Sequence, residues 1–129
     1  MKVCFLTFFI LLSTFQLQAQ SASCSNFKNG KFKSTVGGRT VIIERNGSYQ
    51  KEYLIDVEDS LKMSFNVNWL DDCTYTLTPT KEAYQKYPKL PKNALITVRM
   101  TNVTLNGYTQ SSTSNFVNKT IVGKVLRLK

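Results

Sequence analysis

The chain has 129 residues, with 17 lysines and arginines against 8 aspartates and glutamates, and a formal net charge of +9. It contains no histidine, which excludes nucleophiles activated by histidine and metal sites built on imidazole. A chain of this length accommodates one compact domain and is too short for two.

The first nineteen residues have the pattern of a secretory signal peptide. Lys2 supplies a positive start, residues 3–12 are uncharged and mostly apolar, and the segment ends on the small residue Ala19. The apolar run is shorter than the roughly 20 residues that a membrane-spanning helix needs. We therefore expect residues 1–19 to be removed on export, and residues 20–129 to form a single β domain that is periplasmic or secreted.

The two cysteines that follow the leader, Cys24 and Cys73, predict a disulfide, because an even pair in an exported chain is usually bridged. The alternative is a lipid anchor attached through Cys24. Bacterial lipidation sites favour a leucine-like residue where Ser21 stands, and lipidation would leave Cys73 unpaired. The disulfide is therefore the preferred interpretation.

The mature sequence has the pattern of strands separated by turns. A first strand is expected over residues 27–33, and the next two, 40–45 and 48–57, flank Asn46-Gly47, a pair that suits a tight turn with positive φ. Over residues 61–69 apolar and polar side chains alternate strictly. The alternation resumes over residues 73–78, which predicts a hairpin with one apolar face.

A short helix is expected over residues 80–87, with Thr80 as its N-cap and Pro88 after its end. Asn106-Gly107 then suggests a tight turn between strands 95–105 and 108–116, and the polar run 111–114 suggests a solvent-facing edge. A last strand is expected over residues 121–128. About eight strands joined by hairpins predict an all-β antiparallel meander closed as a small lipocalin-like barrel, with a two-sheet β-sandwich as the alternative.

Three polar residues, Arg45, Gln50 and Glu52, are candidate ligand-binding residues whose orientation depends on the register of the second hairpin. With a two-residue turn, all three face the barrel interior, where buried charges need partners. With a three-residue loop, Gln50 and Glu52 face solvent and the apolar side chains of their strand turn inward. The three-residue loop gives the cleaner apolar face, but the sequence leaves the register of this hairpin open.

A ligand cavity is expected behind Phe65, Val67 and Trp69, which makes Trp69 a fourth candidate ligand-binding residue. Two acidic turns, Asp71-Asp72 and the segment 56–59, have the composition of solvated turns. We expect no catalytic residue, no metal site and no cofactor.

The last third of the chain carries charge of one sign. Such a one-signed surface attracts anions. Residues 83–129 contain no acidic residue, and their basic residues are the candidate anion-binding set: Lys86, Lys89, Lys92, Arg99, Lys119, Lys124, Arg127 and Lys129. Interleaved tyrosines also occur on surfaces that bind single-stranded nucleic acid, but in an exported protein we expect glycans or lipid headgroups and no nucleic acid.

Three spacings, within residues 24–78, resemble a group of small exported bacterial proteins. They are Cys24-x2-Phe27-x2-Gly30-x-Phe32, Ile43-x-Arg45-x4-Gln50-x-Glu52 and Phe65-x-Val67-x-Trp69-x3-Cys73-x-Tyr75-x-Leu77. The segment Gly30-x-Phe32 is also similar to the Gly-x-Trp start of lipocalin-type barrels, with Phe in place of Trp. The resemblance implies an exported bacterial β-protein and implies no activity.

Together these patterns predict a non-catalytic binding protein of the bacterial envelope, for a small apolar ligand or an anionic envelope component. The alternative is a protein–protein interaction or structural envelope module whose exposed edge strands pair with a partner.

Overall fold

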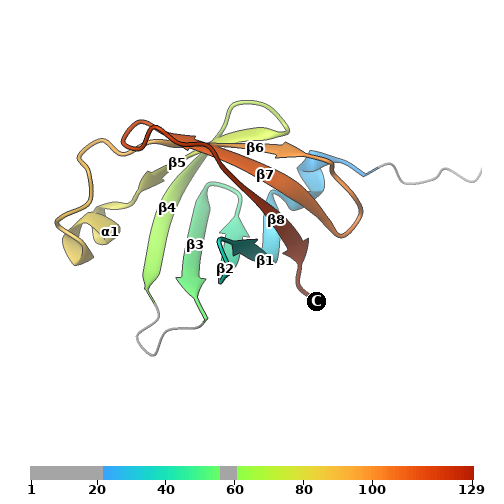
Figure 1. The fold of residues 1–129 in the computed structure, drawn as a ribbon, viewed down its shortest axis with the longest axis horizontal. Helices are drawn as coiled ribbons and strands as arrows, with labels where there is room; N and C mark the ends of the chain where they lie inside the picture. Colours follow the sequence, from blue (N-terminus) through green and yellow to red (C-terminus); the bar gives the residue numbers. More distant parts are fainter. Residues whose placement is uncertain (1–21, 56–60) are drawn as a thin grey trace, which may run out of the picture.

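The computed structural model describes residues 22–55 and 61–129, which form an eight-stranded antiparallel barrel (Figure 1). The strands follow one another around the barrel in sequence order, and the last pairs with the first. They are β1 (Asn29–Val36), β2 (Arg39–Asn46), β3 (Tyr49–Leu54), β4 (Lys62–Trp69), β5 (Thr74–Pro79), β6 (Ile96–Thr101), β7 (Gly107–Ser114) and β8 (Ile121–Arg127).

The predicted meander and its closure as a small lipocalin-like barrel are confirmed, and the two-sheet sandwich is not found. Closure pairs every described strand on both sides, so the described strands offer no free edge to a partner. The expected leader, residues 1–19, and the acidic segment 56–59 lie outside the described residues. No helix in the described part of the chain is long and apolar enough to cross a membrane.

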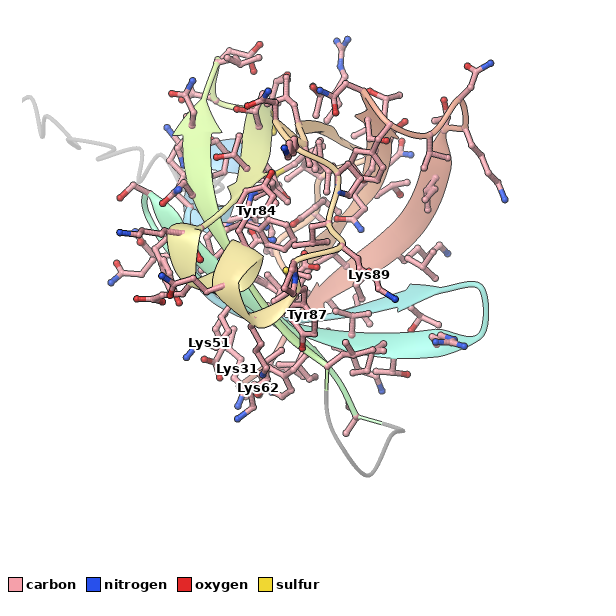
Figure 2. All side chains as sticks on the ribbon, turned by 90° about the vertical axis from the view of Figure 1, so that its left-hand side faces the viewer. Lys31, Lys51, Lys62, Tyr84, Tyr87 and Lys89 are labelled. Carbon is pink, nitrogen blue, oxygen red and sulfur yellow. A yellow bond between two sulfur atoms is a disulfide. The ribbon has the colours of Figure 1, made fainter. Side chains whose placement is uncertain are left out.

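Two short helices complete the fold. Phe27, expected in the first strand, instead ends the 3-10 helix η1 (Cys24–Phe27). The predicted short helix is confirmed as α1 (Lys81–Lys86), whose N-cap Thr80 accepts a 3.1 Å hydrogen bond from the amide of Ala83. Tyr84 joins α1 to the following loop (Figure 2), since its hydroxyl donates to the Pro91 carbonyl and accepts from the Ala94 amide.

The loop between β2 and β3 has two residues, Gly47 and Ser48, because Asn46 pairs with Tyr49. Gly47 supplies the positive φ, at 55°, that such a tight turn needs. Arg45 therefore lies opposite Gln50, so the three-residue register is not found. The turn is Gly47-Ser48 and not Asn46-Gly47, because Asn46 is the last residue of β2. This register puts Arg45, Gln50 and Glu52 on the interior face.

Gly107 does not form the tight positive-φ turn that Asn106-Gly107 suggests. It is the first residue of β7, and the chain turns over residues 102–106, with Asn102 at a φ of 47°. A Cβ at position 107 would lie 2.2 Å from the carbonyl oxygen of Val125 on β8. Glycine is needed here because the two strands approach so closely.

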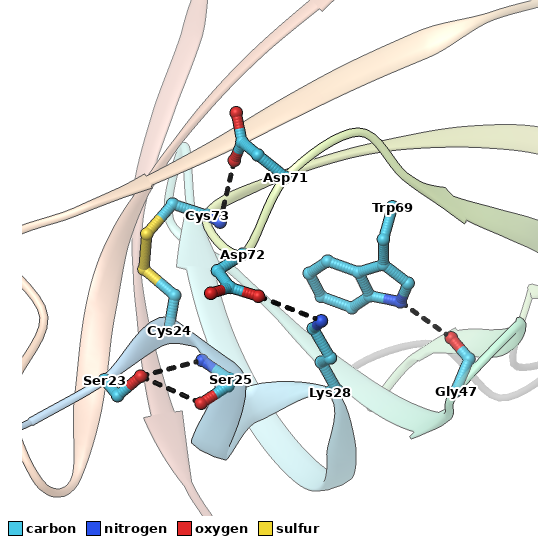
Figure 3. Close-up of polar contacts among 9 residues, drawn as sticks. All are labelled: Ser23, Cys24, Ser25, Lys28, Gly47, Trp69, Asp71, Asp72 and Cys73. Atoms are coloured by element: carbon cyan, nitrogen blue, oxygen red, sulfur yellow. Dashed lines mark hydrogen bonds and ion pairs between the residues drawn. A yellow bond between two sulfur atoms is a disulfide. The ribbon is translucent and has the colours of Figure 1, made fainter.

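The predicted disulfide is confirmed between Cys24 and Cys73, with their Cα atoms 5.1 Å apart (Figure 3). It ties η1 to the turn between β4 and β5. Because the bond occupies the sulfur of Cys24, that sulfur is not available for a lipid anchor. Beside the disulfide, Lys28 forms a 3.2 Å ion pair with Asp72 (Figure 3).

One end of the barrel is closed by aromatic packing under η1. Phe27 is fully buried there, and its ring lies 5.1 Å from that of Tyr108. The guanidinium of Arg127 stacks 4.9 Å from the Phe27 ring and 5.1 Å from the Phe32 ring, and donates to the carbonyls of Asn26 and Asn29. The opposite end of the barrel lacks this aromatic packing, and the interior cavity described below opens there.

Candidate functional site

Arg45 is a buried arginine whose side chain is 3% exposed. Its Nε donates to Oε1 of Gln50 over 2.8 Å, and Nη1 donates to the Phe27 carbonyl over 2.7 Å. Nη2 donates to the hydroxyls of Tyr75 and Tyr108, at 2.7 and 3.2 Å. The guanidinium thus donates hydrogen bonds to residues of η1, β3, β5 and β7, and these bonds fix it in the barrel interior.

Gln50 connects Arg45 to Glu52, which lies nearer the centre of the barrel. Gln50 is fully buried, and its amide nitrogen donates a 2.7 Å hydrogen bond to Oε1 of Glu52. Arg45, Gln50 and Glu52 form one hydrogen-bonded row that starts at the closed end. The structure therefore brings three of the four candidate ligand-binding residues together.

The row ends in a cavity of about 210 Å³ that opens at the end of the barrel opposite η1. Its walls are mainly apolar, with Leu77 from β5, Ile96 and Val98 from β6, and Ile121 from β8. Glu52 is half-buried because its carboxylate faces this space. Lys119 lies at the exposed rim, in the loop between β7 and β8.

The cavity exists because β7 presents small side chains to the interior. Ser112 and Ser114 line the space where larger residues would fill it, and Gln110 lines it nearer the closed end. The run 111–114 was expected to face solvent as an edge, which is wrong, because β7 pairs with both β6 and β8. Every residue of this run is polar, so no alternation of polar and apolar residues marked the inward face.

The pKa values of Arg45 and Glu52 in this row, and of Tyr75, which contacts Arg45, are shifted. Burial raises the pKa of Glu52, against the Gln50 hydrogen bond and the Arg45 charge, which lower it. Burial also holds the pKa of Tyr75 well above its usual value, so that this phenol stays neutral. Burial lowers the pKa of Arg45, but Tyr75 and Tyr108 outweigh that effect and the net shift is upward. Arg45 therefore stays charged.

Trp69, the fourth candidate ligand-binding residue, lies away from the cavity. Its indole nitrogen donates to the Gly47 carbonyl over 3.0 Å (Figure 3), and its ring centroid lies 4.7 Å from that of Tyr75. The cavity lies beyond Tyr75 and is not lined by Phe65, Val67 or Trp69, where it was expected. Tyr75 thus contacts Trp69 on one side and lines the cavity on the other.

The acidic turn 71–72 has a structural role. Asp71 accepts a 2.8 Å hydrogen bond from the Cys73 amide, and this bond lowers the pKa of its carboxyl (Figure 3). Asp72 pairs with Lys28. Within residues 22–55 and 61–129, no three acidic or cysteine side chains gather closely enough to hold a metal ion.

The expected anion-binding residues come from several elements of the barrel. Lys86 belongs to α1, Arg99 to β6 and Lys124 to β8, while Arg127 packs on the aromatic rings of the closed end. The structure instead aligns Lys31, Glu44 and Lys51 as paired residues across β1, β2 and β3. Lys51 and Lys62 line a shallow surface pocket with Lys86. Spacing along the sequence did not reveal this group, because its members come from different strands.

The candidate site is defined by the residues and the geometry of the barrel interior. The resemblance of residues 24–78 to small exported bacterial proteins stays a prediction. Comparisons of the chain with protein families, with curated proteins and with solved structures found no match.

Proposed function

We propose that the protein is an exported, non-catalytic binding protein of the bacterial envelope that holds one small, largely apolar ligand in the barrel cavity. The observation that supports this most is the cavity of about 210 Å³ with apolar walls and one carboxylate at its inner side. Ligand sites commonly combine apolar walls with a few polar groups that orient the ligand. Export is inferred from the leader pattern of residues 1–19 and is consistent with the disulfide.

The mouth of the cavity supports entry from solvent. Phe116, Val117 and Ile121 line it and are 44%, 47% and 42% exposed. Exposed apolar side chains that ring a cavity can contact an apolar ligand as it leaves water. An apolar cavity of about 150 Å³ is enough for benzene, so this one suits a ligand of about nine non-hydrogen atoms.

The test is binding of 2-phenylethanol, measured by ligand-observed NMR on residues 20–129. Wild-type protein should bind it, and Ser112→Phe, which fills the cavity, should not. The matched control is Ser111→Phe, because Ser111 is the neighbour of Ser112 on β7 and does not line the cavity. Equal binding by all three proteins, or by none, would contradict the proposal.

A second candidate function is binding of an anionic envelope component, and the surface pocket that Lys51, Lys62 and Lys86 line favours it. Lys31, Lys51 and Lys62 lie together on the outer face below α1, whereas Lys89 lies apart from them (Figure 2). Glu44 lies between Lys31 and Lys51 and pairs with Lys31 over 3.8 Å. Close cationic side chains attract an extended polyanion. The salt needed for elution from heparin should then fall in Lys51→Gln/Lys62→Gln and change little in Lys119→Gln/Lys124→Gln. The reverse order would assign anion binding to the C-terminal third of the chain.

A further inference from the structure

We infer that the ligand carries a positively charged amino group, which pairs with the carboxylate of Glu52 inside the cavity. This inference rests on the proposed function and adds the chemical class of the ligand. Its apolar part would fill the space between Leu77, Ile96 and Val98, and the ammonium would lie at the inner side.

The first support is the free capacity of the Glu52 carboxylate. In the described part of the chain, its one side-chain hydrogen bond comes from Gln50, to Oε1. No fully buried side-chain oxygen or nitrogen in that part lacks a partner, so Oε2 is in contact with the open space of the cavity. A carboxylate oxygen in this position accepts a hydrogen bond from a ligand donor.

The second support is that Arg45 does not neutralise Glu52 directly. Its nitrogens donate to Phe27, Gln50, Tyr75 and Tyr108, and the Gln50 amide lies between the two charges. Arg45 is therefore committed to its own partners. The row leaves the carboxylate without a cation in hydrogen-bond contact, a costly arrangement for a buried charge.

The third support is the charge of the remaining cavity wall. Only Glu52 and Lys119 among the lining residues carry formal charge, and Lys119 is exposed at the rim. The polar groups at the inner side, on Tyr75 and Gln110, are neutral. An ammonium therefore meets its counter-ion deep in the cavity, whereas a ligand carboxylate there would meet a like charge.

Burial of Glu52 predicts how this binding depends on pH. The groups near Glu52 are Arg45 on β2, Gln50 on β3, Tyr75 on β5 and the rim residue Lys119. Among the carboxyl groups with a shifted pKa, Glu52 is the one that lines the cavity, and burial raises its pKa. Because an ammonium pairs with the ionised form, amine affinity should rise with pH through the pKa of Glu52 in the free protein.

The experiment compares three probes of nearly equal size by calorimetry: 2-phenylethylamine, 2-phenylethanol and phenylacetate. We expect the amine to bind about tenfold or more tightly than the alcohol, because hydrogen bonds to charged groups are the stronger ones, and phenylacetate to bind weakest. In Glu52→Gln the preference for the amine should disappear while the alcohol still binds. That variant is isosteric and keeps an acceptor for the Gln50 amide.

The matched control is Glu44→Gln, which removes the same charge from the outer face of the neighbouring strand, where Glu44 faces Lys31. It should keep the amine preference. Ser112→Phe should abolish binding of both amine and alcohol, which excludes amine binding at the surface. Alcohol binding without amine preference, or a preference that survives Glu52→Gln, would overturn the inference and leave the proposed function intact. Loss of all binding would overturn both.

Discussion

The Nε of Arg45 donates a 2.8 Å hydrogen bond to Oε1 of Gln50, its directly paired neighbour across β2 and β3. This contact holds a charged side chain at the centre of the closed end. It also orients the Gln50 amide, which in turn donates a hydrogen bond to Glu52. The same row holds the barrel together at one end and presents a carboxylate to the cavity at the other.

Replacing Arg45 by leucine should destabilise the protein strongly. The change removes the guanidinium that donates hydrogen bonds to the Gln50 side chain, the Phe27 carbonyl and two tyrosine hydroxyls. Because these acceptors lie in a buried region, we expect the free energy of unfolding to fall by about 3 kcal/mol. Urea unfolding measures it. Arg39→Leu, an exposed position at the start of the same strand, should change stability by no more than about 0.5 kcal/mol. Equal effects of the two variants would show that the buried network adds nothing.

The stability of the protein should depend on the titration of Glu52. Burial raises the pKa of this carboxyl in the folded state, so the folded protein holds the proton more tightly than the unfolded chain. The stabilisation from this proton is complete below the unfolded pKa and is lost as the pH rises through the folded pKa. Glu52→Gln does not titrate, so its stability relative to wild type should increase as the pH rises from about 4, near the pKa of glutamate in an unfolded chain, through the higher folded pKa of Glu52.

Urea unfolding of both proteins across this range measures the difference. Glu44→Gln, on the outer face, should show a nearly constant difference from wild type. The Cys73 amide lowers the pKa of Asp71, which acts with the opposite sign, but Asp71 is common to all three proteins and cancels in the comparison. A difference that falls with rising pH would mean that the interior stabilises the ionised form of Glu52.

Loss of the disulfide should cost about 4 kcal/mol, because Cys24 and Cys73 are separated by 49 positions and a closed loop of that length restricts the unfolded chain. The comparison is urea unfolding of wild type with and without reductant, and of Cys24→Ala/Cys73→Ala. Reductant should lower the wild-type midpoint to about that of the double variant and leave the double variant unchanged. An unchanged wild-type midpoint would show that the cross-link adds no stability.

Two glycines should respond very differently to alanine. At Gly107 the new Cβ would lie 2.2 Å from the Val125 carbonyl, and relief requires β7 and β8 to separate, so we expect a loss of about 3 kcal/mol. At Gly37 nothing lies within 4 Å of the new Cβ, and only the positive φ of 56° is unfavourable, which costs about 1 kcal/mol. Thermal unfolding of both variants measures the contrast. A larger effect at Gly37 would contradict the close approach of β7 and β8.

Much of the barrel was predictable from local patterns. The alternation over residues 61–69 and 73–78 correctly places Val67 and Leu77 in the core, and the two mature cysteines left one pairing for a disulfide. Thr80 and Pro88 marked the start and the end of α1. These signals depend on neighbours in sequence, which is why they could be interpreted without the fold.

The candidate site was predicted only in part. Arg45, Gln50 and Glu52 stood out as a polar set, but the register that turns Gln50 and Glu52 to solvent gave the cleaner apolar face. Their partners are far away in the chain, with Tyr75 and Tyr108 separated from Arg45 by 30 and 63 positions. The cavity was missed because the inward residues of β7 are as polar as the outward ones.

The sequence by itself determined the number and order of the strands, the glycine at the β2–β3 turn and the cysteine pair, because periodicity, turn chemistry and cysteine count act locally. The tertiary structure decided which face of β3 and β7 turns inward and where space remains. Closure of the barrel sets both, since it brings η1, β2, β5 and β7 around one guanidinium and leaves the small side chains of β7 opposite Glu52.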